Sequence, residues 1–504
     1  MLAGTGSDVG KSVIAAALCR IFLQDGYHPA PFKAQNMALN SYATPDGREI
    51  GRAQAMQAEA AGLPCHTDMN PLLLKPQSDH TSQVVLHGRP IGNRDAYSFW
   101  RHDAAADVQD IDFRQEVCGA YDRLAAVYNP IVMEGAGSIS EINLRDHDLV
   151  NMPMARHAGA DVVLVGDIDR GGVFASVYGS IMLQTPEDKK RIKGIVINKF
   201  RGDLRLFDDG RRMLEKLCSV PVLGVIPYFS DIRLDGEDSV ALDKKASHPL
   251  REDENADGRM NVAVVRLPHL ANYTDFDSLE HDARVHLYYS STPDDILQAD
   301  VIILPGSKST FSDLQALRDN GCADAIVEAR RRGKTVVGVC GGYQMMGMVI
   351  CDPSRVESHQ ERIRGLGLLP VVTTMGSVKT TRQSHFKLVN GPQEAVLNSG
   401  NVGQLTGYEI HMGQTRPVDG VPDSPFALLD DGRSDGYVVD DRCMGTYLHG
   451  LFDNGAVADL ILGSCGDNAS WQAQKQQQYD KLAEHVRQHL DMPKLYQILT
   501  TDDD

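Results

Sequence analysis

Short apolar runs alternate with longer segments of helical periodicity through most of the chain. Each run is only a few residues long, is rich in Val, Ile and Leu, and is followed by glycine or polar residues. The clearest runs are 131–133, 162–165, 195–197, 222–226, 301–304 and 336–339. Such runs are typical of buried parallel strands, and their alternation with helices predicts doubly wound α/β architecture.

A charged segment divides this pattern into two halves. Residues 236–260 contain few large apolar side chains, and they include Pro249 and Gly258. This composition indicates an interdomain linker. We therefore expect two doubly wound α/β domains, residues 1–235 and residues 261–504. Near the C-terminus, residues 472–499 have a helical pattern that Pro493 should interrupt.

The strongest local motif is the glycine-rich stretch GTGSDVGKS at residues 4–12, which precedes a helical pattern. Glycines let the backbone turn tightly, and the N–H groups at a helix start bind anions. We expect Gly10, Lys11 and Ser12 to bind ATP, with Lys11 on the phosphates and the Ser12 hydroxyl on Mg²⁺. The alternative is a glycine-rich turn with an incidental Gly-Lys-Ser. Only three residues precede the loop, which predicts either a shortened first strand or a chain start placed several residues late.

Two charged residues end strand-like runs in the N-terminal half. Lys33 ends residues 28–33, and Glu134 ends residues 129–134. Open α/β sheets bind ligands at the carboxyl ends of their strands. Lys33 is thus a candidate phosphate or carboxylate contact, or else a solvated edge lysine. Glu134 is a candidate Mg²⁺ ligand, because Mg²⁺ prefers oxygen, or else a cap for the following turn.

Two further strand ends carry polar residues. Asp167, Asp169 and Arg170 follow one apolar run. The two carboxylates could serve the metal or cap a helix, and Arg170 could clamp a carboxylate or phosphate. Asn198 ends the next run, and its amide offers the donors and acceptor that adenine recognition requires. Arg201 stands where a guanine-reading motif would have Asp, which favours adenine.

The C-terminal half contains a candidate nucleophile. Gly338-x-Cys340-x-Gly342 lies between an apolar run and a helical pattern, as in a nucleophile elbow. A helix N-terminus beside Cys340 would favour its thiolate form. The backbone N–H groups of Gly341 and Gly306 are candidate oxyanion donors. The alternative for Cys340 is a buried structural cysteine.

A thiol nucleophile needs a base, and His449 is the preferred candidate. It ends the strand-like segment 445–449, about a hundred residues after Cys340. A histidine among apolar residues would, taken alone, more often be a core residue. Glu409 and His411 form a second acid–histidine pair that is either catalytic or a cross-strand polar contact.

Composition excludes several classes of protein. The net charge is −18, which disfavours nucleic-acid binding, and an anionic substrate would need a local basic pocket. The nine cysteines form no C-x-x-C pair, so the sequence suggests neither a zinc site nor a disulfide framework. This use of cysteine fits a cytoplasmic location. No apolar run of about 18 residues and no signal peptide are present, so we expect no membrane partner. A homo-oligomer stays possible.

Taken together, the motifs resemble those of the cobyric acid synthase (CobQ) family of glutamine-dependent corrinoid amidotransferases. The resemblance covers residues 4–12, 32–41, 50–60, 68–76 and 167–172 and the Cys340 and His449 motifs. It implies an N-terminal P-loop ATPase like dethiobiotin synthetase, whose variant loop also has one extra residue, and a C-terminal class I glutamine amidotransferase of flavodoxin-like fold.

The resemblance also implies a reaction. Members of the family use ATP and glutamine to amidate the b, d, e and g carboxylates of adenosylcobyrinic acid a,c-diamide, giving adenosylcobyric acid in cobalamin biosynthesis. Cys340 would be the nucleophile and His449 its base. The alternatives are the sister a,c-diamide synthase, and a partition-type ATPase switch with a non-catalytic amidotransferase-like module.

The chain departs from the wider families at two positions. Leu451 stands where class I amidotransferases usually carry a Glu, so the third triad residue is absent or comes from elsewhere, with Glu409 as a candidate. Arg52 falls where dethiobiotin synthetases have a metal-binding Asp. Metal ligation would then rest on Ser12 and Glu134. Four basic residues are candidates for the anionic corrinoid: Arg52, Lys75, Arg89 and Arg170.

Overall fold

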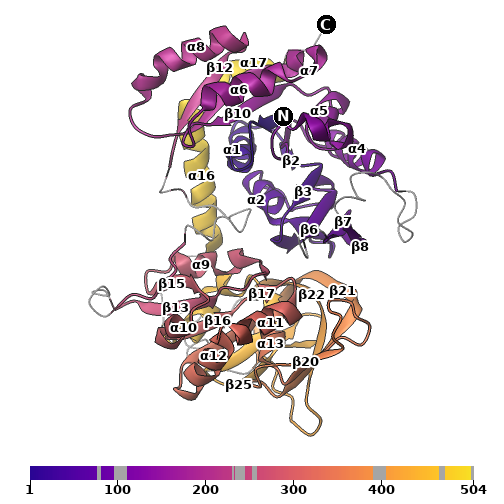
Figure 1. The fold of residues 1–504 in the computed structure, drawn as a ribbon, viewed down its shortest axis with the longest axis vertical. Coiled ribbons are helices and arrows are strands. Elements are labelled where there is room, and N and C mark those ends of the chain that lie inside the picture. Colours follow the sequence, from indigo (N-terminus) through magenta and orange to yellow (C-terminus); the bar gives the residue numbers. More distant parts are fainter. Residues whose placement is uncertain are drawn as a thin grey trace. The chain divides into compact units, whose positions relative to one another are not determined.

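The computed structural model describes residues 1–76, 81–95, 111–229, 232, 245–251, 258–389, 404–464 and 471–500. The chain forms two compact units (Figure 1). The N-terminal unit comprises Met1–Ala38, Ile50–Asp235 and Lys475–Asp504, and the C-terminal unit comprises Leu39–Glu49 and Gly236–Gln474. These units differ from the expected ranges 1–235 and 261–504 in three segments. Residues 39–49 and the predicted linker 236–260 belong to the C-terminal unit, and residues 475–504 belong to the N-terminal unit.

A parallel sheet forms the centre of the N-terminal unit. Its main strands, in spatial order, are β1 (Leu2–Gly4), β10 (Val162–Asp167), β11 (Ile192–Phe200) and β12 (Val222–Pro227). The pair β2 (Ala30–Phe32) and β9 (Ile131–Met133) joins at β1 through a bridge between Leu2 and Glu134. The predicted short first strand is confirmed. The ends of β1, β9 and β10 therefore lie next to one another.

Helices and a second, small sheet complete this unit. Helix α1 (Lys11–Gln24) begins directly after Gly10, whose φ of 98° is open mainly to glycine. Further helices of this unit include α2 (Arg52–Ala60), α4 (Phe113–Ala125), α5 (Met152–His157), α6 (Val173–Met182), α7 (Pro186–Arg191) and α8 (Asp208–Cys218). The small sheet has the order β3 (Gln35–Met37), β6 (Leu72–Pro76), β7 (Thr81–Leu86) and β8 (Arg89–Asp95).

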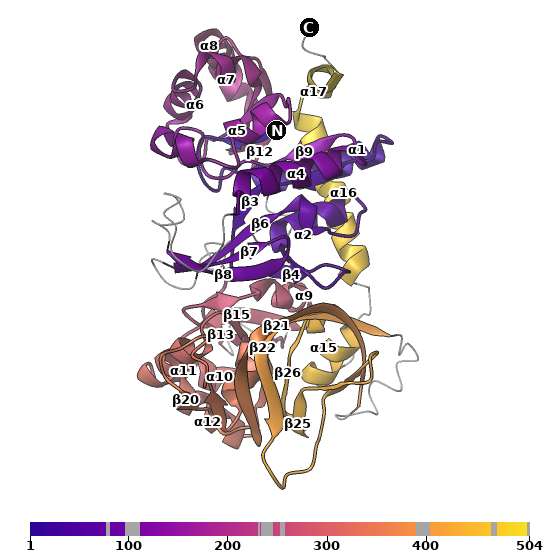
Figure 2. The ribbon, with the colours of Figure 1, turned by 90° about the vertical axis from the view of Figure 1, so that its right-hand side faces the viewer.

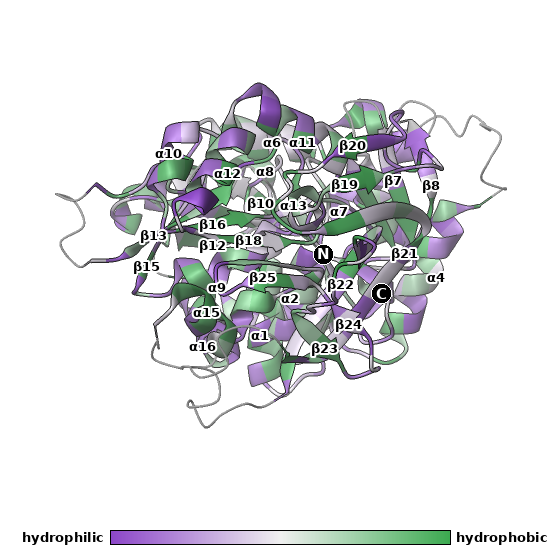
Figure 3. Cartoon of the chain, turned by 90° about the horizontal axis from the view of Figure 1, so that it is seen from below, coloured by the Kyte–Doolittle hydropathy of each residue, from purple (hydrophilic) through white to green (hydrophobic). Residues whose placement is uncertain are grey.

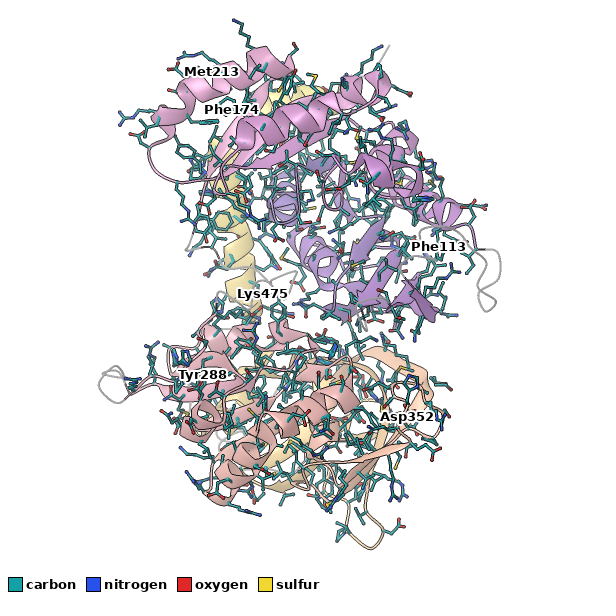
Figure 4. All side chains as sticks on the ribbon, in the orientation of Figure 1. Phe113, Phe174, Met213, Tyr288, Asp352 and Lys475 are labelled. Atoms are coloured by element: carbon teal, nitrogen blue, oxygen red, sulfur yellow. The ribbon has the colours of Figure 1, made fainter. Side chains whose placement is uncertain are left out.

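The C-terminal helices belong to the N-terminal core. Helices α16 (Trp471–His489) and α17 (Met492–Thr500) confirm the predicted helix and its break near Pro493. Tyr479 and Leu482 of α16 are buried in the same apolar cluster as Ile14 of α1. Lys475, labelled in Figure 4, adds an ion pair with Glu59 at 3.2 Å. Residues from both ends of the chain thus build one core.

The C-terminal unit contains a second doubly wound sheet. Its order is β15 (Val285–Ser290), β13 (Met260–Val265), β16 (Val301–Leu304), β18 (Thr335–Val339), β26 (Cys443–Thr446) and β25 (Tyr437–Asp440), and only β25 is antiparallel. Its helices include α10 (Pro293–Gln298), α11 (Thr310–Asp319), α12 (Cys322–Arg331), α13 (Gly341–Met346) and α15 (Gly455–Leu462). Helices α10 and α12 carry both hydrophobic and hydrophilic residues, as partly buried helices do (Figure 3). The expected doubly wound α/β fold of both halves is confirmed.

A second sheet of the C-terminal unit has the order β20 (Arg362–Arg364), β19 (Val349–Cys351), β21 (Val371–Leu388), β22 (Leu405–Pro417) and β27 (Leu448–His449). The long strands β21 and β22 run antiparallel beside each other (Figure 2). The pairing of β22 with β27 sets Tyr408 opposite His449. Strands β14 (Leu270–Ala271) and β17 (Gly306–Ser307) form a short antiparallel ribbon. This ribbon lies beside β27, since Gly306 is close to the His449 side chain.

Part of the predicted linker is attached to the C-terminal unit. Lys245 forms ion pairs with Asp277 at 2.9 Å and Glu280 at 2.6 Å, and the Tyr289 N–H donates to the carbonyl of Ala246. Residues 236–244 and 252–257 of the predicted linker lie outside the described residues. Within the described part of the chain, no helix combines the length and apolar character that a membrane crossing needs.

Candidate active sites

Strand β18 delivers Cys340 to a sharp turn before α13. Cys340 has φ 51° and ψ −109°, a conformation that L-residues rarely adopt, and its side chain is buried. A Cβ on Gly342 would come within 2.0 Å of the Leu304 carbonyl oxygen, and one on Gly338 within 2.7 Å of the Tyr343 nitrogen. The predicted strand, turn and helix are therefore present, and the two glycines are required by close backbone contacts.

His449 connects Cys340 to a buried carboxylate. Its Nδ1 lies 2.6 Å from Oδ2 of Asp275, and the imidazole also experiences the charge of Cys340. Burial alone would lower the pKa of His449, but the charges of Asp275 and Cys340 outweigh it and raise the pKa to about 10. The raised pKa favours the protonated form of the His449 imidazole at neutral pH.

Asp275 is held in place by several donors. The backbone N–H of Gly450 donates to its Oδ1 at 3.0 Å, and the Tyr408 hydroxyl donates to the same oxygen at 3.2 Å. These bonds leave Oδ2 for His449 and fix the direction from which the imidazole is held. Asp275 is thus placed to orient His449 in a candidate Cys340–His449–Asp275 triad.

The expectation that Glu409 supplies the third triad residue is wrong. Its carboxylate accepts hydrogen bonds from Arg382, Arg433 and Ser384 instead. Asp275 lies 174 positions before His449, in the 3₁₀ turn Tyr273–Phe276. No spacing marked it in the sequence. The only available signal was an acidic residue between aromatic residues shortly after an apolar run.

The predicted oxyanion donors lie beside the triad. Gly306 of β17 is so close to His449 that a Cβ would come within 3.3 Å of the imidazole Cε1. A Cβ on Gly341 would come within 2.8 Å of the Ser307 backbone nitrogen. The structure therefore brings both glycines to the surroundings of Cys340 and His449, where backbone N–H groups can stabilise a developing oxyanion.

The phosphate-loop residues converge on Glu134 in the N-terminal unit. Ser12 Oγ and Lys33 Nζ each donate to Glu134 Oε1 at 2.8 Å, and Gln57 Nε2 donates to Oε2 at 2.6 Å. Lys11 Nζ donates to the carbonyls of Gly6 and Gly137, each at 3.0 Å. The sequence-predicted residues Lys11, Ser12, Lys33 and Glu134 thus form one site at the carboxyl ends of β1, β2 and β9.

The donor atoms of this site suit a magnesium ion. Ser12 offers a hydroxyl oxygen and Glu134 a carboxylate oxygen, and Mg²⁺ prefers hard oxygen ligands while keeping several waters. Among the described residues, no group of three or more His, Cys, Asp or Glu side chains could hold a metal. A magnesium ion at Ser12 and Glu134 would therefore depend on nucleotide phosphates and water for its other ligands.

Asn198 supports the phosphate loop directly. Its Nδ2 donates to the Val9 carbonyl at 2.8 Å, and a Cβ at Gly10 would come within 2.2 Å of that nitrogen. Its role in adenine recognition stays a prediction. Asp167 pairs with Lys199 at 2.9 Å, and the mostly exposed Arg170 lies 3.3 Å from Asp8 of the loop.

The four candidate corrinoid contacts come from different parts of the N-terminal unit, and their role in substrate binding stays a prediction. Lys75 of β6 is buried and lies opposite Gln83, whereas Arg89 of β8 is exposed and lies opposite Leu86, at the other end of the small sheet. Arg52 is buried as the first residue of α2, and Arg170 follows β10. Strand register separates Lys75 from Arg89 by about 10 Å along the strands.

Both halves of the chain match known family models. Residues 1–240 match the CobQ/CobB/MinD/ParA nucleotide binding domain, and residues 261–457 match the CobB/CobQ-like glutamine amidotransferase domain. The chain is 63% identical to a cobyric acid synthase of Bacteroides fragilis, covering 100% of this chain and 98% of the relative. It is 61% identical to a cobyric acid synthase of Phocaeicola vulgatus, covering 100% of this chain and 98% of the relative. It is 46% identical to a cobyric acid synthase of Salmonella heidelberg, covering 99% of this chain and 98% of the relative.

Proposed function

Because the chain belongs to the cobyric acid synthase family, we propose that it amidates corrinoid side-chain carboxylates in cobalamin biosynthesis with ATP and glutamine. The substrate is adenosylcobyrinic acid a,c-diamide, and the b, d, e and g carboxylates become amides. The supporting observation is that one chain holds both the Cys340–His449–Asp275 triad and the Lys11–Ser12–Glu134 site. A cytoplasmic location and a homo-oligomer stay predictions.

The triad liberates ammonia from glutamine. The Cys340 thiolate attacks the side-chain amide carbon, and N–H groups of Gly341 and Gly306 stabilise the oxyanion. His449 gives its proton to the departing nitrogen, so that the C–N bond breaks and ammonia leaves a thioester on Cys340. Water, deprotonated by His449, then hydrolyses the thioester to glutamate. Asp275 keeps the imidazole oriented throughout.

The phosphate-loop site activates the carboxylate. A corrinoid carboxylate attacks the γ-phosphoryl group of ATP, giving an acyl phosphate and ADP, and ammonia then displaces phosphate to form the amide. Lys11 and Lys33 balance negative charge on the transferring group. A magnesium ion held by Ser12 and Glu134 would supply further charge neutralisation at the phosphates.

A cavity beside the phosphate loop suits one corrinoid side chain. It has a volume of about 230 Å³ and is lined by residues including Gln35, Gly137, Ser138 and Asn151. This is below the roughly 300–1,000 Å³ of typical drug-sized ligand pockets, so the macrocycle must stay outside. Gln35 Oε1 is buried without a hydrogen-bond partner. We assign this cavity to the reacting side chain, because Gly137 also accepts a bond from Lys11.

The test is incubation of the protein with ATP, Mg²⁺, glutamine and a corrinoid acid, with mass spectrometry of the products. The proposal predicts up to four amides on adenosylcobyrinic acid a,c-diamide. Amidation of cobyrinic acid at only the a and c positions would instead identify an a,c-diamide synthase. Nucleotide-driven dimerisation without glutamine hydrolysis would favour the partition-type switch.

A further inference from the structure

A segment of the N-terminal half is built into the C-terminal unit. Residues Leu39–Glu49 belong to that unit and include β4 (Ser41–Ala43), which pairs with β5 (Glu49–Gly51). Ala43 shares an apolar cluster with Tyr408 and Ile410, and Tyr42 packs against this cluster. The segment is therefore part of the amidotransferase fold although it lies more than 200 positions before that domain's first central strand.

Polar contacts fasten both strands of the segment. Gln383 Nε2 of β21 donates to the Ala43 carbonyl at 3.0 Å. Glu49 forms an ion pair with Lys379, and the two side chains are 0% and 6% exposed. Burying two charges is costly unless their geometry is fixed, so this pair holds the segment in one place.

The segment contacts two residues, Asn272 and Tyr408, that in turn contact His449. The backbone N–H of Ser41 donates to Asn272 Oδ1 at 3.0 Å, and Asn272 Nδ2 lies 3.4 Å from Nδ1 and 3.5 Å from Nε2 of His449. The Tyr42 ring lies 4.7 Å from the Tyr408 ring, which in turn stacks on the imidazole at 5.1 Å with an interplanar angle of 20°.

The contacts of Asn272 and Tyr408 limit a tilt of the His449 imidazole that the bond to Asp275 leaves free. A single bond to Nδ1 leaves the imidazole free to tilt about the line between the two residues. Asn272 Nδ2 lies at nearly equal distances from both ring nitrogens, and the Tyr408 ring stacks on the imidazole, so both side chains limit such a tilt. Nε2 must face Cys340 and the departing nitrogen, and small misplacements of a reacting group can cost about 10²-fold in rate.

We propose that residues 39–49 are a positioning element of the glutaminase, acting on His449 through Asn272 and Tyr408. The proposal deepens the proposed function and rests on its glutamine-hydrolysing half. The segment lies in the chain between Lys33 and Arg52, two residues assigned to the other reaction. The polypeptide of the ATP-dependent half therefore supplies part of the amidotransferase site, and Asn272 is a positioning residue.

The test compares Asn272→Gly with Asn272→Asp in the full chain. Asn272 has φ 56° and ψ 41°, so glycine keeps the backbone and removes only the amide. Aspartate keeps an acceptor for Ser41 and places a carboxylate beside the imidazolium. We expect Asn272→Gly to lower kcat for glutamine hydrolysis about tenfold or more with little change in KM. Asn272→Asp should restore much of that loss and move the alkaline limb of the pH profile upward.

Tyr42→Ala tests the segment itself, with Tyr178→Ala as the control on an exposed tyrosine of α6. We expect Tyr42→Ala alone to lower kcat severalfold while the thermal unfolding midpoint stays near that of the wild type. Wild-type kcat in Asn272→Gly or in Tyr42→Ala would overturn the proposal, as would an equal loss in Tyr178→Ala. Glutamine hydrolysis is assayed without corrinoid, so an incorrect corrinoid assignment leaves this test valid.

Discussion

Asp275 Oδ2 lies 2.6 Å from His449 Nδ1, and the two side chains are only 3% and 2% exposed. Their contact joins residues 174 positions apart, and both are also tied to Tyr408. The carboxylate fixes the ring and stabilises its protonated form, which is the form that can give a proton to departing ammonia. The proposed glutamine hydrolysis would therefore depend on a residue outside the Cys340 and His449 motifs.

Asp275→Asn tests this contact. The substitution keeps the size of the side chain but removes the charge and disturbs the hydrogen bond to Nδ1, so kcat for glutamine hydrolysis should fall by about 10²–10⁴. Amidation supported by added ammonia should stay near the wild-type rate. Asp324→Asn, at an exposed position of α12, is the control. Unchanged glutamate release in Asp275→Asn would remove Asp275 from the triad.

The pH dependence of glutamine hydrolysis reports the state of His449. Its folded-state pKa is raised from the ordinary 6.5 to about 10, so the imidazolium persists below that value and is lost as pH rises through it. We expect the alkaline limb of kcat/KM near pH 10 rather than near 6.5. In Asp275→Asn the alkaline limb should move to lower pH. Burial lowers the pKa of His449, and this variant lacks the Asp275 charge that mainly opposes that effect. A wild-type limb near 6.5 would refute the ion pair.

Glu134→Gln tests the phosphate-loop site. Glutamine keeps an acceptor for Ser12 and Lys33 but loses the charge that Mg²⁺ requires, so ammonia-supported amidation should fall at least about 10²-fold. The Mg²⁺ concentration for half-maximal rate should rise. Glutamine hydrolysis measured without ATP should change by less than about twofold, since Glu134 belongs to the other unit. Normal amidation at ordinary Mg²⁺ would contradict the assigned role.

Leu482→Ala tests whether the C-terminal helix completes the N-terminal core. Leu482 is fully buried with Ile14 and Val165, and removing a buried leucine side chain typically costs about 2–5 kcal/mol. Lys481→Ala, on the exposed neighbour, should change the free energy of unfolding by less than about 0.5 kcal/mol. Denaturant titration of the two variants measures the difference. Equal stabilities would mean that α16 contributes little to this core.

Local patterns predicted the parts of both sites that depend on strand ends. The loop before α1, the turn at Cys340 and the run before Glu134 each join an apolar strand to a chemically distinctive residue. In parallel sheets such ends meet at one edge, so Ser12, Lys33 and Glu134 converge as expected. The same logic applies to Cys340 and His449, which follow the carboxyl ends of the paired parallel strands β18 and β26.

Contacts without a local pattern could not be predicted in this way. Asp275 lies in a 3₁₀ turn whose position is set by the ribbon of β14 and β17, and no periodicity marks it. No sequence pattern marked residues 39–49 as part of the C-terminal unit, to which strand pairing and the buried Glu49–Lys379 contact assign them. Lys75 and Arg89, both candidates for the corrinoid, lie at different positions along the small sheet, because strand register decides which end of a sheet a residue occupies.

The most direct measurement follows corrinoid amidation by Cys340→Ala with glutamine and, separately, with ammonia as the nitrogen donor. Removing the thiol abolishes thioester formation but leaves Lys11, Ser12 and Glu134 intact. We predict no amide from glutamine and near wild-type amide formation from ammonia. Equal loss with both donors would contradict the separation of ammonia release from carboxylate activation, and undiminished use of glutamine would exclude Cys340 as the nucleophile.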